Sequence, residues 1–210
     1  MRLFGIVILI LVLFSCKKES GEERNSLWLK CAINDTDYLI ESNEGKGIYA
    51  DSRYIIDYDN TGSDSITALL MAYCLDNNHD YVFVTIRKTL PPAFYDSISS
   101  QVEFKSYDDF RDAFPIGDVP FVTLNNDIED GVIIEYQSDN GVRMSSGNDD
   151  FQHSNFVNCS FRITSTERFY SFRHEKDGLR VFANFEATLY NGQGDSIRIE
   201  DADCALLFVP

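Results

Sequence analysis

The sequence predicts a mainly β protein, an antiparallel β-sandwich of about ten strands with one short helix. Short apolar runs with a period of two residues recur from residue 27 to the C-terminus, as expected of strands that bury one face. Clusters of Asp, Asn, Gly and Ser separate these runs and indicate turns. With 44% hydrophobic and 13% aromatic residues, the chain has ample apolar surface for a packed core. A closed β-barrel is the alternative arrangement of the same strands.

The first 15 residues have the pattern of an export signal. One basic residue, Arg2, is followed by an uncharged apolar run from Leu3 to Phe14. A helix that crosses about 30 Å of hydrocarbon needs roughly 20 residues, so this run is too short to span a bilayer. We therefore interpret residues 1–15 as a signal peptide that is removed from the mature protein.

The end of this segment, Leu13-Phe14-Ser15-Cys16, resembles a bacterial lipobox. In that family the signal is cut before the cysteine, whose thiol and new amine are both acylated by fatty acids such as palmitate. The resemblance implies that Cys16 is lipidated and anchors the protein to a membrane without spanning it. Several acyl chains on one residue anchor stably, because each buried methylene contributes about 0.8 kcal/mol. An ordinary secretory signal with a coincidental cysteine is the alternative.

Residues 16–26 are expected to form a flexible charged tether, because no apolar residue occurs between Cys16 and Ser26. Their start, Cys16-Lys17-Lys18-Glu19, resembles lipoproteins of Bacteroidota, in which such a stretch is associated with display on the outer face. The resemblance implies a location in the bacterial cell envelope, on the surface or the periplasmic face of the outer membrane. A simple solvated linker is the alternative.

Residues 27–210 are expected to form one β-sandwich domain, since no Pro/Ser-rich linker and no repeat interrupts them. The apolar alternation places the strands, in chain order, at 27–33, 38–41, 53–58, 65–75, 82–86, 131–137, 142–145, 159–164, 180–189 and from 197 onward. The run 65–75 is apolar on both faces, which predicts a strand covered on two sides. Asn140-Gly141 indicates a tight hairpin.

One helix is expected near residues 107–114. Ser106 and Asp109 have the spacing of a capping box, which marks the start of a helix. The apolar residues of one helical face are Tyr107, Phe110 and Phe114. Pro115 follows directly and predicts the end of the helix.

The C-terminal strands resemble the closing strands of small β-sandwich lipoproteins of Bacteroidota, whose function is uncharacterised. The stretches that carry the resemblance are Phe161-Arg162-Ile163-Thr164, Val181 to Asn191 and Gly194 to Ile199. The opening strand and turn, Cys31 to Asp35, match that family as well. Ala183 stands where the family usually has glycine, and Ala202 has no glycine near it. The family supplies no catalytic residues.

Four cysteines remain beside the one in the lipobox: Cys31, Cys74, Cys159 and Cys204. An even number in an oxidising compartment allows two disulfides with three connectivities. Each of the four also lies on the apolar face of a predicted strand, where free cysteine packs as a small hydrophobe. No close Cys-x-x-Cys pair occurs, so the spacing does not indicate a zinc site.

The charge and the missing motifs exclude several functions. The chain has 34 acidic and 18 basic residues and a net charge of -16, and loss of Arg2 with the signal makes the mature chain more acidic still. Nucleic-acid binding requires Lys and Arg at the phosphates, so no nucleic-acid partner is expected. No Gly-x-Ser-x-Gly, His-Glu-x-x-His or phosphate loop occurs, and no cofactor or metal site is indicated.

These observations predict a non-enzymatic binding or structural module with a glycan or an envelope protein as its partner. Tyr81, Phe83 and Phe182 lie on the non-core side of predicted strands, where aromatic rings can stack on sugars. The alternative is an envelope hydrolase of the glycosidase type that uses paired carboxylates. With 34 acidic residues in the chain, the sequence does not single out such a pair.

The tripeptide Asp-Ser-Ile occurs three times, with its serine at Ser65, Ser97 and Ser196. It resembles the O-glycosylation acceptor of exported Bacteroidota proteins, and the resemblance implies that these serines carry sugar. The alternative is a turn, in which Asp-Ser leads the chain into a strand.

Overall fold

The computed structural model describes most of the chain beyond the predicted tether. The described ranges are 27–42, 47–57, 65–76, 79–96, 101–102, 104–123, 130–147, 156 and 158–210. The predicted signal peptide, the predicted tether, the predicted lipidation site Cys16 and the candidate acceptor Ser97 lie outside them. No helix within these ranges is both long and apolar enough to cross a membrane.

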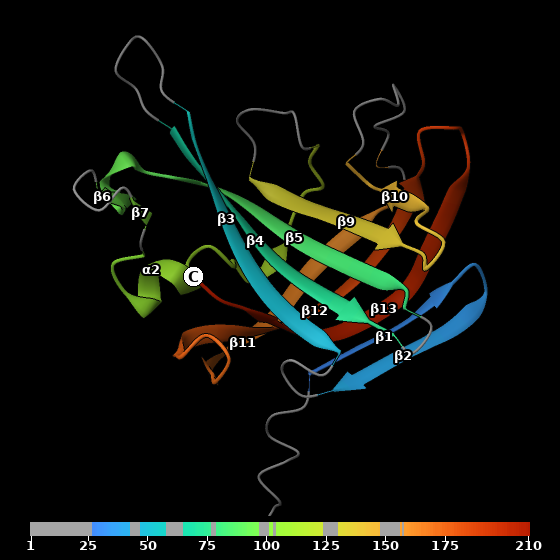
Figure 1. Ribbon diagram of the computed structural model, residues 1–210, viewed down its shortest axis with the longest axis horizontal. Helices are drawn as coiled ribbons and strands as arrows, with labels where there is room; N and C mark the ends of the chain where they lie inside the picture. Colours follow the sequence, from blue (N-terminus) through green and yellow to red (C-terminus); the bar gives the residue numbers. More distant parts are fainter. Residues whose placement is uncertain are drawn as a thin grey trace, which may run out of the picture.

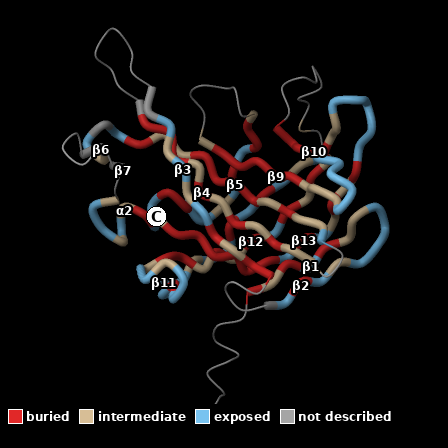
Figure 2. Tube along the Cα trace, in the orientation of Figure 1, coloured by how far each residue is buried: buried red, intermediate tan, exposed pale blue. Residues whose placement is uncertain are grey.

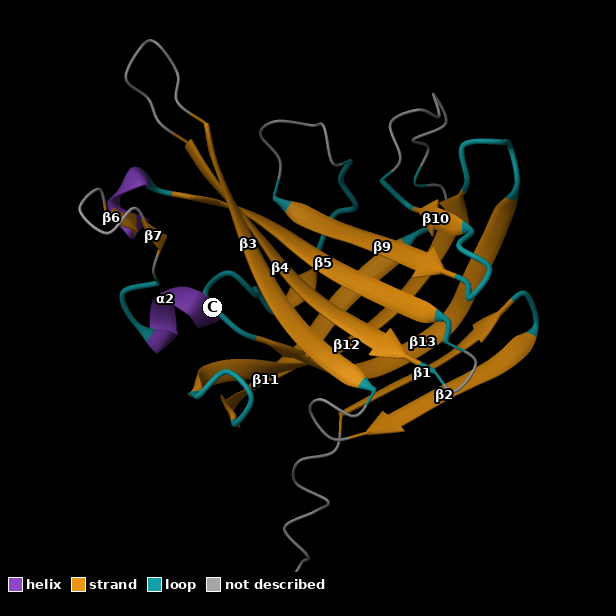
Figure 3. Cartoon of the chain, in the orientation of Figure 1, coloured by secondary structure: helices purple, strands orange, loops and turns teal. Residues whose placement is uncertain are grey.

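Strands dominate the structure, as the sequence predicts (Figure 3). In chain order they are β1 (Leu27–Ile33), β2 (Thr36–Ser42), β3 (Ile48–Asp57), β4 (Ser65–Leu75), β5 (Tyr81–Leu90), β6 (Tyr95–Asp96), β7 (Gln101–Val102), β8 (Gly117–Asp118), β9 (Gly131–Gln137), β10 (Arg143–Ser145), β11 (Ser160–Ser171), β12 (Lys176–Tyr190) and β13 (Ser196–Phe208). The helical segments are the 3-10 helix η2 (Pro92–Phe94) and the α-helix α2 (Tyr107–Arg111).

All strands except β6 and β7 belong to one antiparallel sheet. Its main path runs in the order β2-β1-β13-β12-β10-β9-β5-β4-β3. One edge of β12 pairs with β13. The other edge pairs with β11 as far as Glu186 and with β10 at Tyr190. The short strand β8 pairs with the free edge of β11. The path ends at β2 and β3, so among the described strands the sheet does not close, and the barrel alternative is wrong.

The sheet folds over itself into two facing layers (Figure 1). One layer contains β3, β4, β5 and β9, and the other contains β2, β1, β13, β12 and β11, with β13 packed against β3 and β4. The short strand β10 joins the layers at one corner, where Ser145 pairs with Glu135 of β9 and with Tyr190 of β12. Each strand can therefore bury its inner face against the opposite layer, and the predicted sandwich is confirmed.

The inner faces of the two layers form the core (Figure 2). Along β12 the inward side chains are, as predicted, Val181, Ala183, Phe185, Ala187 and Leu189, all buried.

The prediction that residues 65–75 are covered on both sides is only half right. Leu70 and Ala72 of β4 lie in the core, whereas Met71 and Tyr73 on its outer face remain partly exposed. The outer side of β4 thus carries apolar side chains that remain partly exposed.

The helix α2 is shorter than predicted, because it ends at Arg111 and not near residue 114. Ser106 caps it as expected: its hydroxyl oxygen accepts a hydrogen bond from the backbone N–H of Asp109 at 3.1 Å. Beyond Arg111 the N–H of Phe114 bonds to the Arg111 carbonyl, which is the tighter spacing of a 3-10 turn. Pro115 has no N–H with which to continue the helix.

A series of phenylalanine rings beside α2 closes one end of the sandwich. Its members, in order of contact, are Phe94, Phe104, Phe110, Phe114 and Phe208. Neighbouring ring centroids are 5.7, 5.1, 5.4 and 4.9 Å apart, and the last ring belongs to β13. Aromatic contact with the core therefore decides where this short helix lies, since five residues would not hold a helix alone.

Candidate functional site

Four aromatic side chains form a continuous row on the outer face of the β3-β4-β5 layer. They are Tyr49 of β3, Tyr73 of β4, and Phe83 and Tyr81 of β5, and we call them the aromatic row. Tyr49 pairs with Tyr73 and Tyr73 with Phe83 in the strand register. The successive ring centroids lie 4.9, 5.6 and 5.8 Å apart. All four residues are half-buried, so the row is accessible to a ligand.

The rings of the aromatic row stack with a tilt. The angles between successive ring planes are 11°, 31° and 22°, so each ring partly covers the face of the next. The guanidinium of Arg173, from the turn between β11 and β12, lies 5.4 Å from the ring centroid of Tyr49. Burial raises the pKa of Tyr73, while the nearby charge of Arg173 lowers it. The row therefore ends against a cation at β3.

A charged pair lies at the other side of the row. Glu135 of β9 stands opposite Phe83 in the strand register and is almost fully buried. Its carboxylate accepts hydrogen bonds from Nε and a terminal nitrogen of Arg143, at 3.0 and 2.7 Å. The apolar row is thus bordered by groups that can donate or accept hydrogen bonds.

The sequence predicts two of the four rings in the aromatic row. Tyr81 and Phe83 lie on the outer face, as their alternation indicates. Phe182 lies on the opposite layer, between Trp28 at 5.7 Å and the Arg180 guanidinium at 5.2 Å, and is not part of the row. Tyr49 and Tyr73 were missed: β3 starts five residues earlier than predicted, and β4 was expected to be covered on both sides.

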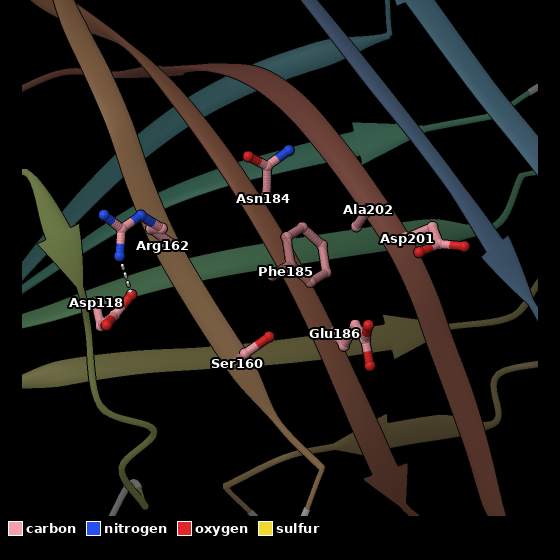
Figure 4. A pocket seen from close by; sticks show the side chains of 8 residues that line it. All are labelled: Asp118, Ser160, Arg162, Asn184, Phe185, Glu186, Asp201 and Ala202. Atoms are coloured by element: carbon pink, nitrogen blue, oxygen red, sulfur yellow. Dashed lines mark hydrogen bonds and ion pairs between the residues drawn. The ribbon is translucent and has the colours of Figure 1, made fainter.

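A polar hollow of about 380 Å³ lies on the other layer (Figure 4). Its charged and polar lining residues are Asp118, Ser160, Arg162, Asn184, Glu186 and Asp201. It forms where β12 and β13 lose register next to Glu186, a bulge at which Asp201 adopts a φ of 49°. Asp118 accepts a hydrogen bond from Arg162 at 2.8 Å, and Glu186 accepts one from Arg198 at 2.7 Å.

The four cysteines are free thiols in the structure. Cys31, Cys74 and Cys204 point into the core from β1, β4 and β13, and burial raises the pKa of Cys31 to about 12 and those of the other two above their ordinary values. Cys159 is half-buried just before β11. An oxidised pair stays a prediction. No group of three or more His, Cys, Asp or Glu side chains in the described ranges is placed to hold a metal ion.

The candidate glycosylation serines occupy strand starts. Ser65 is the first residue of β4, and Ser196 is the exposed first residue of β13. Both positions fit the turn alternative, in which Asp-Ser leads into a strand, while modification of these serines stays a prediction.

Comparison of this chain with protein-family models, with curated proteins and with solved structures found no match.

Proposed function

We propose that this protein is a lipid-anchored envelope protein that binds a glycan on its aromatic row and does not act as an enzyme. The observation that carries the proposal is the unbroken run of four rings across three strands, on a face that the opposite layer leaves open. The anchor is supported by the lipobox Leu13 to Cys16.

A glycan matches the chemistry of the row. The C–H faces of a sugar ring are apolar and pack on aromatic rings, while its hydroxyls need hydrogen-bond partners. Three of the four rings are tyrosines, whose phenol groups can donate and accept, and the guanidinium of Arg173 lies over the ring at one end of the row. An extended sugar chain would lie across the strands and contact several rings at once.

The variant Tyr73→Ala tests the row, because this ring contacts both Tyr49 and Phe83. We expect about tenfold weaker binding of soluble envelope polysaccharides in affinity electrophoresis, corresponding to about 1.4 kcal/mol. Phe182→Ala is the matched control, since it removes a partly exposed ring from the opposite layer. Thermal unfolding of both variants separates lost binding from the lost cross-strand contacts that also stabilise a sheet. Equal retention of glycan by both variants would contradict the proposal.

The variant Cys16→Ala tests the anchor independently of the glycan. The wild-type chain, expressed in a bacterial host that is fed radiolabelled palmitate, is expected to carry label and to sediment with the membranes. The variant is expected to lose both properties, because the fatty acids are joined to Cys16 and the net negative charge of the chain opposes stable attachment to an anionic bilayer without them. Equal labelling of the two chains would show that acylation does not occur at this residue.

The hydrolase alternative is favoured by one observation, the carboxylates of Asp118, Glu186 and Asp201 around the polar hollow. Asp118 and Glu186 are exposed carboxylates, each bonded through one oxygen to an arginine, whereas a carboxyl group that acts as a general acid is usually buried among apolar groups. The aromatic row therefore supports binding better than the hollow supports hydrolysis.

A further inference from the structure

The turn between β11 and β12 carries the most exposed large apolar side chain of the described residues. Phe172 is 76% exposed, and its ring contacts that of Tyr170, 49% exposed, edge-to-face at 5.3 Å. Arg173 and Lys176 beside them are exposed cations, with the exposed Glu175 between them, and the Lys176 ammonium donates a hydrogen bond to the carbonyl oxygen of Pro210. Two exposed aromatic rings next to the Arg173 guanidinium form an amphipathic tip on a chain that is strongly acidic as a whole.

The described part of the chain begins at the same end of the sheet as this tip. Trp28, at the start of β1, pairs with Ala205 of β13, and Ala205 pairs with Phe182 of β12. From Phe182, β12 extends back to Lys176, a distance of about 20 Å at about 3.3 Å per residue. Figure 1 shows β1 starting on the same side of the molecule as the turn between β11 and β12.

The chain that precedes β1 is long enough to place the tip against a bilayer. Residues 16–26 lie between the proposed acylation site and β1, and they can extend to at most about 40 Å at roughly 3.6 Å per residue. Lys17 and Lys18 place further positive charge next to the acyl chains. Aromatic side chains favour the interfacial region of a bilayer, and Lys and Arg near the surface are attracted to anionic lipid.

We propose that the turn between β11 and β12 is a membrane-contacting tip, in which Phe172 and Tyr170 enter the lipid interface and Arg173 meets the headgroup phosphates. This inference rests on the proposed lipid anchor at Cys16. The acyl chains hold the protein to the membrane, and the tip adds a second point of contact that sets the orientation of the sandwich. The long axis of β12 then points away from the bilayer.

The test uses the full chain, acylated by its host and reconstituted into vesicles of phosphatidylethanolamine and phosphatidylglycerol with brominated acyl chains. Trp28 is first changed by Trp28→Phe, because it is the chain's single tryptophan. Phe172→Trp then reports on the tip. Val142→Trp is the matched control, since Val142 is 44% exposed and lies near β10, which pairs at the far end of the roughly 45 Å strand β12.

We expect the brominated acyl chains to quench the fluorescence of the Phe172→Trp variant, and the less polar surroundings of its ring to shift the emission to shorter wavelength, while the fluorescence of the Val142→Trp variant stays unchanged. Quenching of neither variant, or equal quenching of both, would overturn the membrane-contacting tip. The intact mass of the purified chain is measured first. A mass without acyl chains would refute the anchor and, with it, the contact that depends on the anchor, whereas an acylated chain without quenching refutes the tip alone.

Discussion

Asp80, in the turn between β4 and β5, connects parts of the sandwich that are distant in sequence. One carboxylate oxygen accepts hydrogen bonds from the hydroxyls of Tyr136 at 2.8 Å and Tyr38 at 3.3 Å, and the other accepts from the N–H of Asp139 at 2.8 Å. Burial and then the neighbouring carboxylates raise the pKa of both tyrosines. The hydroxyls therefore stay protonated donors, and Asp80 ties β2 of one layer to β9 of the other.

We predict that Asp80→Ala lowers the free energy of unfolding by about 2 kcal/mol. The hydrogen bonds to a charged acceptor are lost, and the partly buried hydroxyls of Tyr38 and Tyr136 no longer have that acceptor. Urea unfolding followed by circular dichroism measures the change. Asp37→Ala is the control, since Asp37 is an exposed neighbour of Tyr38 on β2 and should alter stability by less than about 0.5 kcal/mol. Similar losses in the two variants would mean that Asp80 does not connect the layers.

At the scale of elements, the close approach of β12 to β13 depends on Gly178. A Cβ atom built at this position would lie 2.5 Å from the carbonyl oxygen of Phe208 and 3.1 Å from a methyl of Val209. The Phe208 carbonyl oxygen is a backbone atom, so it cannot move away from an added Cβ as the end of a flexible side chain can. Glycine is therefore required here for packing and not for its φ angle.

Gly178→Ala is expected to destabilise the protein by about 1–3 kcal/mol, the usual effect of overpacking a filled interior. Differential scanning calorimetry would detect this as a lower melting temperature. Asn184→Ala on the same strand is the matched substitution, because Asn184 is exposed on the outer face and its loss removes a surface hydrogen bond to Asp203. If both variants melted at the same temperature, the close contact at Gly178 would be excluded as a constraint.

The strand boundaries differ in how well the sequence predicts them. β12 alternates regularly, because it is paired on both sides and buries one face in the core, whereas β13 alternates only as far as Cys204 and is buried throughout residues 204–208. β3 begins at Ile48, earlier than the predicted residue 53, since its start contains the polar Asp51 and Ser52. An edge strand tolerates such residues because one side of it faces solvent. The helix length was overestimated because the Phe114 contact with Phe208 draws the chain into a tighter turn.

At the scale of the whole molecule, buried thiols and phenols make stability depend on alkaline pH. Burial raises the pKa of Cys31 from 9.0 to about 12, and it raises those of Cys74, Cys204, Tyr38 and Tyr136 in the same direction. The folded state thus holds protons that the unfolded chain releases from about pH 9 upward. The stability these groups contribute is fully present below that pH and is lost as the pH rises.

We predict a falling urea midpoint, measured in the presence of a reductant, as the pH is raised from about 8 to about 11. Cys31→Ala should show a smaller fall over the same range, because one of the groups with a raised pKa is removed. A midpoint that stayed constant over this range would contradict the burial of these groups in the native state.

The two proposed sites lie next to each other in the whole molecule. Arg173 belongs to the turn proposed to contact the membrane, and its guanidinium also lies over Tyr49 at the end of the aromatic row. A glycan bound along the row would therefore have one end close to the bilayer. This arrangement suits a ligand that is itself attached to, or emerges from, the envelope surface.

The sequence by itself determined the class of the fold, the principal strands of the C-terminal third and the cap at Ser106, because alternation and capping are local patterns. It also contains the stretch Leu13 to Cys16, on which the proposed lipid anchor rests. Only the tertiary structure decided that Tyr49 and Tyr73 join Phe83 and Tyr81 in one row, and that Phe182 lies on the other layer. The reason is physical: a row across strands depends on their register and on which layer each strand joins, and long-range pairing sets both.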